Sequence, residues 1–305
     1  MRSVTVQVPA TTANLGPGYD CLGLALGLHN VVTLALADEP GVRIEGEGAQ
    51  SLPRDGTHLV LGAAQAAADA AGETLPALDL HQLNRIPLAR GLGSSSAAIV
   101  GGIVAANALL ELGLSERAML DIATAVEGHP DNVAPALLGG LTVCCTLESE
   151  RAPARAEVLV ERLDVAPGLS CVVAIPDFEV ATHEARRALP EDIPHADGVF
   201  NLCRVGLIVA GLVSGDFGVL GEAMRDRLHQ PYRAHLVPGM DDVVAAALDA
   251  GAHGAALSGS GPTVAAFVSE GGEEVGAAMV NAFARAGTTA VARTLPLSPE
   301  GARII

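Results

Sequence analysis

A turn rich in glycine and serine is the segment of this sequence best suited to chemistry. Residues 87–98 read PLARGLGSSSAA and stand between an expected strand and an alanine-rich stretch of helical composition. Gly91 and Gly93 allow backbone angles closed to other residues, so successive N–H groups can converge on one anion. A helix that starts at the serines directs the positive end of its dipole to the same point. The turn therefore predicts a phosphate site, and an ordinary glycine turn with a serine N-cap is the alternative.

The turn differs from the two most familiar phosphate-binding patterns. It lacks the Gly-Lys-[Ser/Thr] ending of a P-loop, and it does not complete the GxGxxG of a dinucleotide fold. Its serine hydroxyls are suitable ligands for phosphate oxygens or for a magnesium ion. By itself the segment indicates phosphate without identifying the molecule that carries it.

The elements expected to position this turn follow one another without strict alternation. Apolar and alternating runs predict strands over residues 3–8, 42–48, 78–84, 139–147, 170–175, 254–257 and 263–268. Helical patterns cover residues 57–71, 95–112, 115–127, 198–213, 219–227, 239–250 and 275–286, and Ser115 is the expected N-cap of the third. This irregular mixture favours an α+β fold over a doubly wound parallel sheet.

Length and one polar stretch predict two domains. A chain of 305 residues corresponds to about two domains. Residues 148–157 are charged and contain Ala and Pro, which is typical of a boundary. We therefore expect an N-terminal domain over residues 1–155, which carries the turn, and a C-terminal domain over residues 156–305.

The charge balance disfavours several classes of partner. Eighteen Lys and Arg residues against 35 Asp and Glu residues give a formal net charge of −17. This field repels phosphate at long range, so we expect no nucleic acid and no membrane as a partner. A nucleotide stays compatible, because backbone amides and a metal ion can hold phosphate without a basic patch. The lack of Trp and an aromatic content of 2% argue against a base-stacking surface.

The cysteines and the N-terminal residues predict a cytoplasmic protein. The five cysteines are odd in number and form no CxxC pair, which is typical of reduced structural thiols. The first residues, MRSVTVQVPA, contain no apolar signal core. The apolar stretch over residues 97–114 is interrupted by Asn107 and Glu111, so we interpret it as an internal helix.

Three separated motifs resemble those of the GHMP kinases, a family of small-molecule kinases. Residues 87–98 resemble the family's phosphate loop, residues 9–20 (PATTANLGPGYD) its N-terminal substrate motif, and residues 257–263 (LSGSGPT) its C-terminal glycine-rich motif. Their order and spacing also fit. The resemblance implies an N-terminal half like the second domain of ribosomal protein S5, a ferredoxin-like C-terminal half, and an active site in the cleft between them. It also implies ATP as co-substrate, with Mg2+.

Within this family the sequence is most similar to the homoserine kinases. The segments that carry this similarity are EGHPDNVAP (127–135), ATHEAR (181–186) and DRLHQPYR (226–233). The resemblance implies transfer of the γ-phosphoryl group of ATP to the side-chain hydroxyl of L-homoserine, on the route to threonine. A homodimer is a further expectation, since the family often forms one.

The resemblance also assigns five residues to the homoserine site, namely Asn14, Asp20, Asn132, Arg186 and Arg233. The guanidinium forks of Arg186 and Arg233 suit a carboxylate. Asp20 suits an ammonium group, and the amides of Asn14 and Asn132 suit a hydroxyl. The local alternatives are that each Arg is a solvated surface charge and each Asn caps a turn.

The same resemblance assigns the nucleotide and metal residues. Ser95 and Glu127 are the expected magnesium ligands, with a plain helix end as the alternative for Glu127. The ATP loop comprises Pro87, Leu88, Ala89, Arg90, Gly91, Leu92, Gly93, Ser94, Ser95, Ser96 and Ala97. We interpret His129 as structural and Asp131 as a support for the loop of Asn132. The sequence does not decide whether His229 is a ligand or a packed imidazole.

The chain has no obvious equivalent of the Asp–Lys pair that several relatives use as a base. We therefore expect direct attack by an oriented hydroxyl, with Asn132 and Arg186 as the catalytic residues that position it. Three alternatives stay open: a GHMP kinase for mevalonate, a sugar or a related alcohol; a catalytically silent nucleotide-binding relative; and an α+β interaction domain that binds no ATP.

Overall fold

Five strands from the first half of the chain, together with β6 and the C-terminal β11, form a seven-stranded sheet. The computed structural model describes residues 2–147 and 157–305, and within these residues the sheet contains β1 (Ser3–Ala13), β2 (Leu22–Leu36), β3 (Gly41–Gly46), β4 (Leu78–Asn84), β5 (Leu141–Leu147), β6 (Glu157–Leu163) and β11 (Arg303–Ile304). Five of them follow the order β11-β1-β2-β4-β3. The long β2 pairs with β4 near its end and with β5 near its start, and β5 pairs with β6.

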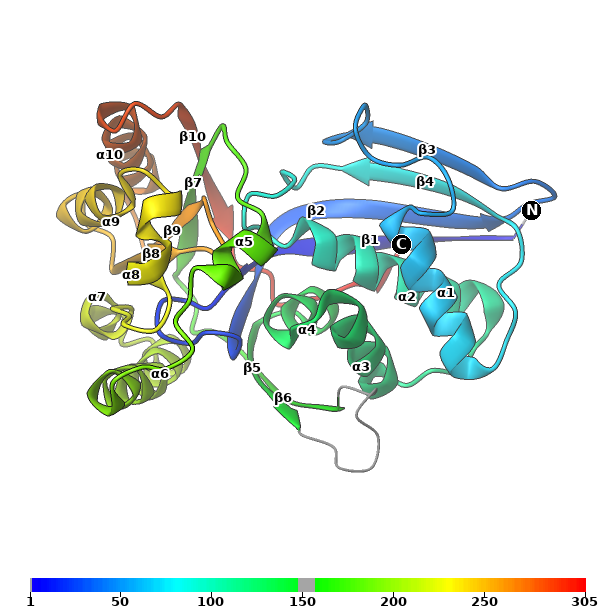
Figure 1. Ribbon diagram of the computed structural model, residues 1–305, viewed down its shortest axis with the longest axis horizontal. Coiled ribbons are helices and arrows are strands. Elements are labelled where there is room, and N and C mark those ends of the chain that lie inside the picture. The colour runs from blue at the N-terminus through cyan, green and yellow to red at the C-terminus, as the bar shows by residue number, and fades with distance from the viewer. Residues whose placement is uncertain (1, 148–156) are drawn as a thin grey trace.

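Four helices cover one face of this sheet (Figure 1): α1 (Leu59–Ala71), α2 (Ser94–Leu110), α3 (Glu116–Glu127) and α4 (Pro130–Leu138). The central helix α2 is buried along most of its length. Its small residues let neighbours approach closely, since a Cβ on Gly102 would lie 2.4 Å from the carbonyl oxygen of Val60 in α1. The alanine-rich sequence of α2 therefore reflects close packing inside the protein.

Strands from the second half form a four-stranded antiparallel sheet in the order β10-β7-β9-β8. These strands are β7 (Ser170–Pro176), β8 (Gly254–Leu257), β9 (Val264–Val268) and β10 (Ala290–Pro296). In β7 the side chains alternate between two cores. Val172 and Ala174 pack with α9 (Met240–Asp249) and α10 (Gly272–Arg285), whereas Cys171 and Val173 join the core shared with the first sheet.

The remaining helices lie around the junction of the two halves. They are α5 (Thr182–Arg187), α6 (His195–Ser214), α7 (Leu220–Ala223), α8 (Gln230–Arg233) and the 3-10 turns η1 (Phe217–Val219) and η2 (Ala234–Leu236). Figure 1 shows α5 between the two sheets. Residues of α6 and α7 contribute to the core that both halves share, so the two halves pack into one body.

The α+β prediction is confirmed, and most expected elements are present within a few residues of their expected bounds. Ser115 is the N-cap of α3, where its side chain accepts a hydrogen bond from the N–H of Ala118. The strand expected to end at Pro9 continues to Ala13, because a register shift between Pro9 and Ala10 absorbs the proline.

Other expectations about local structure were wrong. The helix expected over residues 219–227 ends at Ala223, after which a turn takes over. Asn132 lies on α4 and not in a loop; Pro130 occupies the first turn of this helix, where a missing N–H costs nothing. The strands β2, β6, β10 and β11 and the helices α4, α5 and α8 were not expected at all.

The expected domain boundary lies mostly outside the described residues, which lack 148–156. The strand β6 pairs with β5 of the first sheet, and β11 returns from the chain end to pair with β1. The division into 1–155 and 156–305 therefore stays a proposal, with one change. We propose to move its boundary to the position after Leu163, because that position leaves the hydrogen bonds between β5 and β6 within one domain.

Candidate active site

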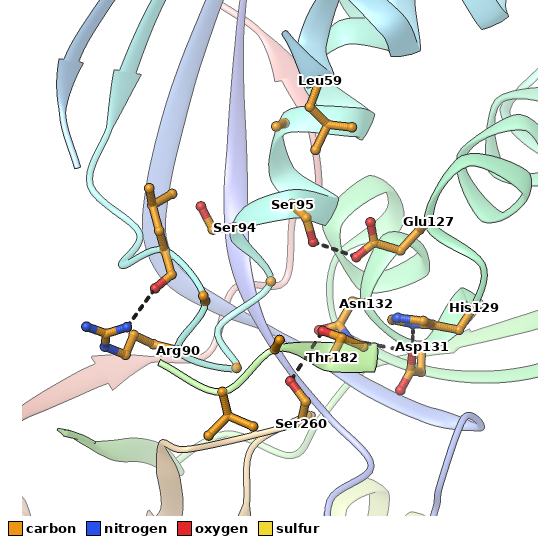
Figure 2. Close-up of a pocket in the computed structure, with 18 of the residues that line it drawn as sticks. Leu59, Arg90, Ser94, Ser95, Glu127, His129, Asp131, Asn132, Thr182 and Ser260 are labelled. Atoms are coloured by element: carbon orange, nitrogen blue, oxygen red, sulfur yellow. Dashed lines mark hydrogen bonds and ion pairs between the residues drawn. The ribbon is translucent and has the colours of Figure 1, made fainter. Parts of the chain in front are cut away.

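The three glycine-containing motifs meet around one cavity of about 410 Å³. Its lining residues include Asn14 and Asp20 from the first motif, Gly91, Gly93, Ser94 and Ser95 from the turn, and Gly259 and Ser260 from the last motif, as well as residues of α3, α4 and α5. Figure 2 shows Ser95 of the turn, Glu127, Asn132, Thr182 and Ser260 of the last motif around one space. Residues distant in the chain thus form a single site.

Tertiary contacts explain why residues 91 and 93 of the turn are glycines. Gly93 is the N-cap of α2 with φ of 70°, and a Cβ there would lie 2.0 Å from Thr11 Oγ1. A Cβ on Gly91 would lie 2.2 Å from the carbonyl oxygen of Ser258. Any larger residue would push β1 or the last motif away from the turn. Because the N-cap has no side chain, no side-chain oxygen caps the first N–H groups of α2, contrary to the serine-cap alternative.

Arg90 ties the turn to the second half of the protein. Its guanidinium donates to the carbonyl oxygens of Pro176 at 3.0 Å and Asp177 at 3.2 Å, and it forms an ion pair with Glu179 at 3.2 Å. These partners follow the end of β7. Arg90 therefore holds the turn in place through contacts with the protein itself.

Ser95 and Glu127, the two expected metal ligands, lie side by side. Ser95 Oγ donates to Glu127 Oε1 at 2.6 Å (Figure 2). Ser96 Oγ donates to the same oxygen at 2.8 Å. Glu127 is the last residue of α3, and Ser95 lies in the first turn of α2. A carboxylate and a hydroxyl are oxygen donors that suit Mg2+, which keeps several waters or phosphate oxygens besides.

Asp20 and Arg186, which both line the cavity, form a bidentate ion pair. Arg186 Nη2 lies 2.7 Å from Asp20 Oδ1, Nη1 lies 2.9 Å from Oδ2, and Nη1 also donates to Tyr19 Oη at 2.8 Å. Burial lowers the pKa of Arg186, but the Asp20 carboxylate outweighs burial and raises it overall. About a third of each side chain stays exposed, 36% for Arg186 and 35% for Asp20. The residues expected to bind a carboxylate and an ammonium group are thus neighbours.

Arg233 is a buried cation, 2% exposed, on α8. Its Nε donates to the carbonyl oxygen of Ala185 at 3.1 Å and its Nη1 to that of Gly259 at 3.2 Å. Among residues 2–147 and 157–305, no carboxylate forms an ion pair with it. Burial lowers its pKa, as expected for a charge without a counter-ion. A buried cation of this kind is stabilised when an anion binds beside it.

The two asparagines differ in how much of the side chain is free. Asn14 Nδ2 donates to the carbonyl oxygen of Gly259 at 2.9 Å, and its Oδ1 accepts from the N–H of Asp20 at 3.1 Å. Asn132 Oδ1 accepts from Thr11 Oγ1 at 2.8 Å, whereas its Nδ2 has only a long contact of 3.5 Å with Asp131 Oδ1. The Nδ2 group of Asn132 can therefore donate a hydrogen bond to a ligand, whereas both polar atoms of the Asn14 amide are hydrogen-bonded to the protein.

His129 and Asp131 form a close pair beside Asn132. His129 Nδ1 lies 2.6 Å from Asp131 Oδ1, and Asp131 is 2% exposed. Burial lowers the pKa of His129, but the hydrogen bond and charge of Asp131 outweigh it and raise the pKa. Asp131 Oδ1 contacts both His129 Nδ1 and Asn132 Nδ2, so the His129–Asp131 pair helps to fix the orientation of the Asn132 side chain.

The sequence left open whether His229 is a ligand or a packed imidazole. In the structure it is a packed imidazole. Its Nε2 lies 2.7 Å from the carbonyl oxygen of Gly16, which requires a proton on Nε2. Its Nδ1 lies 3.2 Å from Arg233 Nη1 and therefore accepts a hydrogen bond. Burial lowers the pKa of His229, in agreement with this neutral form. The ring holds the first motif and Arg233 together.

Replacing His229 with Gln should flatten the pH dependence of stability. The folded protein keeps His229 neutral, whereas the unfolded chain takes up a proton below about pH 6.5. The stability supplied by the neutral ring is therefore present above that pH and lost as pH falls toward the lowered folded pKa. The free energy of unfolding of wild type should fall by up to about 1.4 kcal/mol more per pH unit than that of His229→Gln. Urea unfolding between pH 5 and 7 measures both slopes, and equal slopes would contradict the assignment.

Sequence reasoning missed a second group of cavity residues. Tyr19, Thr182 and Ser260 lie inside matched motifs and were within reach of that reasoning. Another set lines the end of the cavity near α1 and β4 and belongs to no motif: Leu52, Pro53, Thr57, His58, Leu59, Gln82 and Asn84. No local pattern identifies these residues, because the fold alone brings them to the cavity.

Comparisons with known sequences identify the family. The family described as GHMP kinases N terminal domain matches residues 58–140, and GHMP kinases C terminal matches residues 208–285. The homoserine kinase of Desulfitobacterium hafniense is 46% identical over 99% of this chain and 100% of its own length. That of Moorella thermoacetica is 46% identical over 98% of this chain and 99% of its own.

Solved structures give the same result for the fold. The crystal structure of homoserine kinase from Cytophaga hutchinsonii has a TM-score of 0.87 and 33% identity, and the match covers 100% of this chain and 98% of that chain. The L. major mevalonate kinase has a TM-score of 0.69 and 16% identity, with 95% of each chain covered. At that identity the likeness concerns the fold alone.

Proposed function

Since this chain belongs to the homoserine kinases of the GHMP kinase family, we propose that the residues around its cavity divide the work of one reaction. The reaction is phosphorylation of the side-chain hydroxyl of L-homoserine by ATP, which yields O-phospho-L-homoserine. The two alternatives without kinase activity are set aside on the same basis.

The charges around the cavity are the observation that carries the substrate assignment. Homoserine has a carboxylate and an ammonium group on one carbon, so its site needs a cation and an anion close together. Asp20 and Arg186 form such a pair, and the buried Arg233 supplies a second cation without a carboxylate partner among the described residues. In our proposal the substrate carboxylate binds between Arg186 and Arg233, and its ammonium group binds Asp20.

In this proposal Asn14 does not contact the substrate and acts through Asp20. Its amide joins the backbone of Asp20 to Gly259, and its backbone has φ of 69°, which Asn tolerates better than most residues. We therefore propose that Asn14 fixes the loop that presents Asp20. This differs from the hydroxyl contact that the amide side chain of Asn14 led us to expect.

We propose that the triphosphate of ATP binds at residues 87–97. Gly91 and Gly93 allow the backbone to approach it, and the free N–H groups at the start of α2 offer hydrogen bonds to its oxygens. Ser95 and Glu127 would hold Mg2+, which neutralises phosphate charge when bound. The hydroxyl of Ser96 supports the Glu127 carboxylate from the side.

The adenine base would occupy the end of the cavity near α1 and β4. Leu52, Pro53 and Leu59 supply apolar surface there. Buried polar atoms in the same part, His58 Nε2 and Gln82 Oε1, have no hydrogen-bond partner among the described residues. An unpartnered buried polar atom is costly, and the polar edge of a base can satisfy it.

The hydroxyl of homoserine would attack the γ-phosphoryl group without a strong protein base. Asn132 Nδ2 is the donor that remains free beside the expected hydroxyl position, and Asp131 with His129 keeps it in place. Arg186 would help to position this hydroxyl by holding the substrate carboxylate. Positioning and charge neutralisation can supply most of the acceleration in phosphoryl transfer.

Replacing Asn132 with Ala should lower kcat by about 10- to 100-fold, since one positioning hydrogen bond in a transition state contributes about 1.4 to 3 kcal/mol. The affinity for ATP should stay close to wild type, because Asn132 lies on α4 and outside the ATP loop. Steady-state ADP release and nucleotide binding by calorimetry measure the two quantities. Unchanged turnover would remove Asn132 from this role.

A panel of acceptors tests the function as a whole. Magnesium-dependent ADP release is measured with L-homoserine, mevalonate, galactose and no acceptor in parallel. We expect stimulation by L-homoserine alone. Stimulation by another alcohol would keep the phosphate site and overturn the roles of Asp20, Arg186 and Arg233.

We also propose that the enzyme is cytoplasmic and works as a homodimer. Its five cysteines are all free, and Cys171 is fully buried with a pKa raised to about 12 by desolvation, which keeps the thiol protonated. The net charge of −17 disfavours binding to nucleic acid or an anionic membrane.

A further inference from the structure

The hydroxyl of Ser258 lies where the three motifs around the cavity meet. Ser258 belongs to the last motif, follows directly after β8 and is fully buried. Its Oγ donates to the carbonyl oxygen of Gly91 in the turn at 2.6 Å and lies 2.8 Å from Thr12 Oγ1 of the first motif. Because Ser258 itself does not line the cavity, it can act on a ligand only through residues that do.

The carbonyl oxygens of the turn are held from outside the turn. Four consecutive ones accept hydrogen bonds from distant segments: Ala89 from the N–H of Val180 at 3.4 Å, Arg90 from the N–H of Thr263 at 3.4 Å, Gly91 from Ser258 Oγ at 2.6 Å, and Leu92 from the N–H of Thr11 at 3.1 Å. The bond to Gly91 is the shortest of these four. It is also the one whose donor is a side chain, so a substitution can remove it without changing the backbone.

These bonds also orient the N–H groups of the turn. In a planar trans peptide, the C=O of one residue and the N–H of the next point in opposite directions. The bond from Ser258 to the carbonyl oxygen of Gly91 therefore directs the N–H of Leu92 away from Ser258. Among the described residues, the N–H groups of Gly91, Leu92 and Gly93 form no hydrogen bond with the protein. The turn thus keeps three successive donors available for an anion.

We propose that Ser258 is a positioning residue for ATP, whose hydroxyl fixes the Gly91–Leu92 peptide in the orientation that the triphosphate requires. Donors that are already oriented need no rearrangement when the anion binds, so the bond from Ser258 contributes to ATP affinity. The inference rests on the proposed binding of the triphosphate at residues 87–97. It adds to that site a residue from the second half of the chain.

Ser258→Ala removes the hydroxyl and tests this role. Adenosine carries no phosphate, so the ratio of the dissociation constants for adenosine and ATP isolates the contribution of the phosphate groups. We expect the variant to bind ATP about 5- to 20-fold more weakly than wild type, and to bind adenosine within about twofold of wild type. Isothermal titration calorimetry with Mg2+ measures ATP directly, and titration of ATP in the presence of adenosine measures adenosine by competition.

Ser298→Ala is the matched control. Ser298 is also a buried serine, 7% exposed, whose Oγ donates to a backbone carbonyl oxygen, that of Glu300 at 2.7 Å, and it does not line the cavity. Its variant loses a comparable hydrogen bond and should keep the wild-type ratio. Ser258→Cys keeps a weaker donor and should give a ratio between those of wild type and Ser258→Ala. It takes the place of Ser258→Ala if that variant does not fold, as judged by urea unfolding.

The outcomes separate this role from the phosphate site on which it rests. A folded Ser258→Ala variant with the wild-type ratio would overturn the role of Ser258 and leave the phosphate site intact. Equal weakening of ATP and adenosine would also overturn it, since Ser258 would then only support the shape of the cavity. A wild type that binds ATP no more tightly than adenosine would contradict the phosphate site itself, and the role of Ser258 with it.

Discussion

Glu127→Gln is expected to lower kcat by about 100- to 1,000-fold and to raise the Mg2+ concentration needed for half-maximal activity. Glu127 Oε1 accepts hydrogen bonds from the hydroxyls of Ser95 and Ser96. A Gln side chain keeps the shape and one acceptor oxygen but removes the negative charge that attracts the cation. Initial rates of ADP release, measured in a Mg2+ titration at saturating ATP and homoserine, give both quantities.

Glu116→Gln is the matched control for this experiment. Glu116 is an exposed residue at the other end of α3, so its variant should follow the wild-type Mg2+ titration. If Glu127→Gln also follows the wild-type titration, then the carboxylate does not hold the cation. Glu127 would in that case serve only to fix the serines of α2.

Arg186→Ala is expected to lower kcat/KM for L-homoserine by about 100- to 1,000-fold, which corresponds to about 3 to 4 kcal/mol for loss of a charge-assisted bidentate contact. The acceptor 3-aminopropan-1-ol has the same hydroxyl and amine but no carboxylate. Its kcat/KM should change much less, because it cannot use the guanidinium of Arg186. The ratio of kcat/KM for L-homoserine to kcat/KM for 3-aminopropan-1-ol should therefore be much smaller in the variant than in wild type. The affinity for ATP should not change.

Two further variants make this result interpretable. Arg187→Ala removes an exposed neighbouring arginine of α5 and should behave like wild type. Arg186→Lys keeps a positive charge beside Asp20, so it should recover part of the loss without the bidentate contact. An equal fall for both acceptors in Arg186→Ala would contradict the carboxylate assignment and leave Arg186 acting on phosphoryl transfer itself.

Much of the fold was predictable from local patterns. Alternation and apolar runs predicted strands such as β4 and β7, and Ser115 predicted the start of α3. Two of the misses share a physical cause. The strand β10 exposes most of its residues and forms only by pairing with β7, and β11 consists of two residues held by β1. Such elements depend on partners far along the chain, which a local pattern does not contain.

The candidate site was predictable to the extent that it consists of motifs. Ser95 and Glu127 were expected to act together and lie 2.6 Å apart through their side-chain oxygens. Asn14 was expected to contact the substrate, yet both ends of its amide bond the protein. His58 and Gln82 gave no signal in the sequence, because their unpartnered atoms become meaningful only once burial is known.

The sequence by itself determined the residue types and the order of the three motifs, and therefore the family, the reaction and the segment that we propose for phosphate binding. These are properties of neighbouring residues: two glycines allow a tight turn, and a helix that follows it supplies free N–H groups. Only the tertiary structure decided that Asp20 pairs with Arg186, that Arg233 is buried without a carboxylate partner among the described residues, and that Gly91 lies against Ser258. Those contacts join residues more than 150 positions apart, and the packing of the two sheets and their shared core sets them.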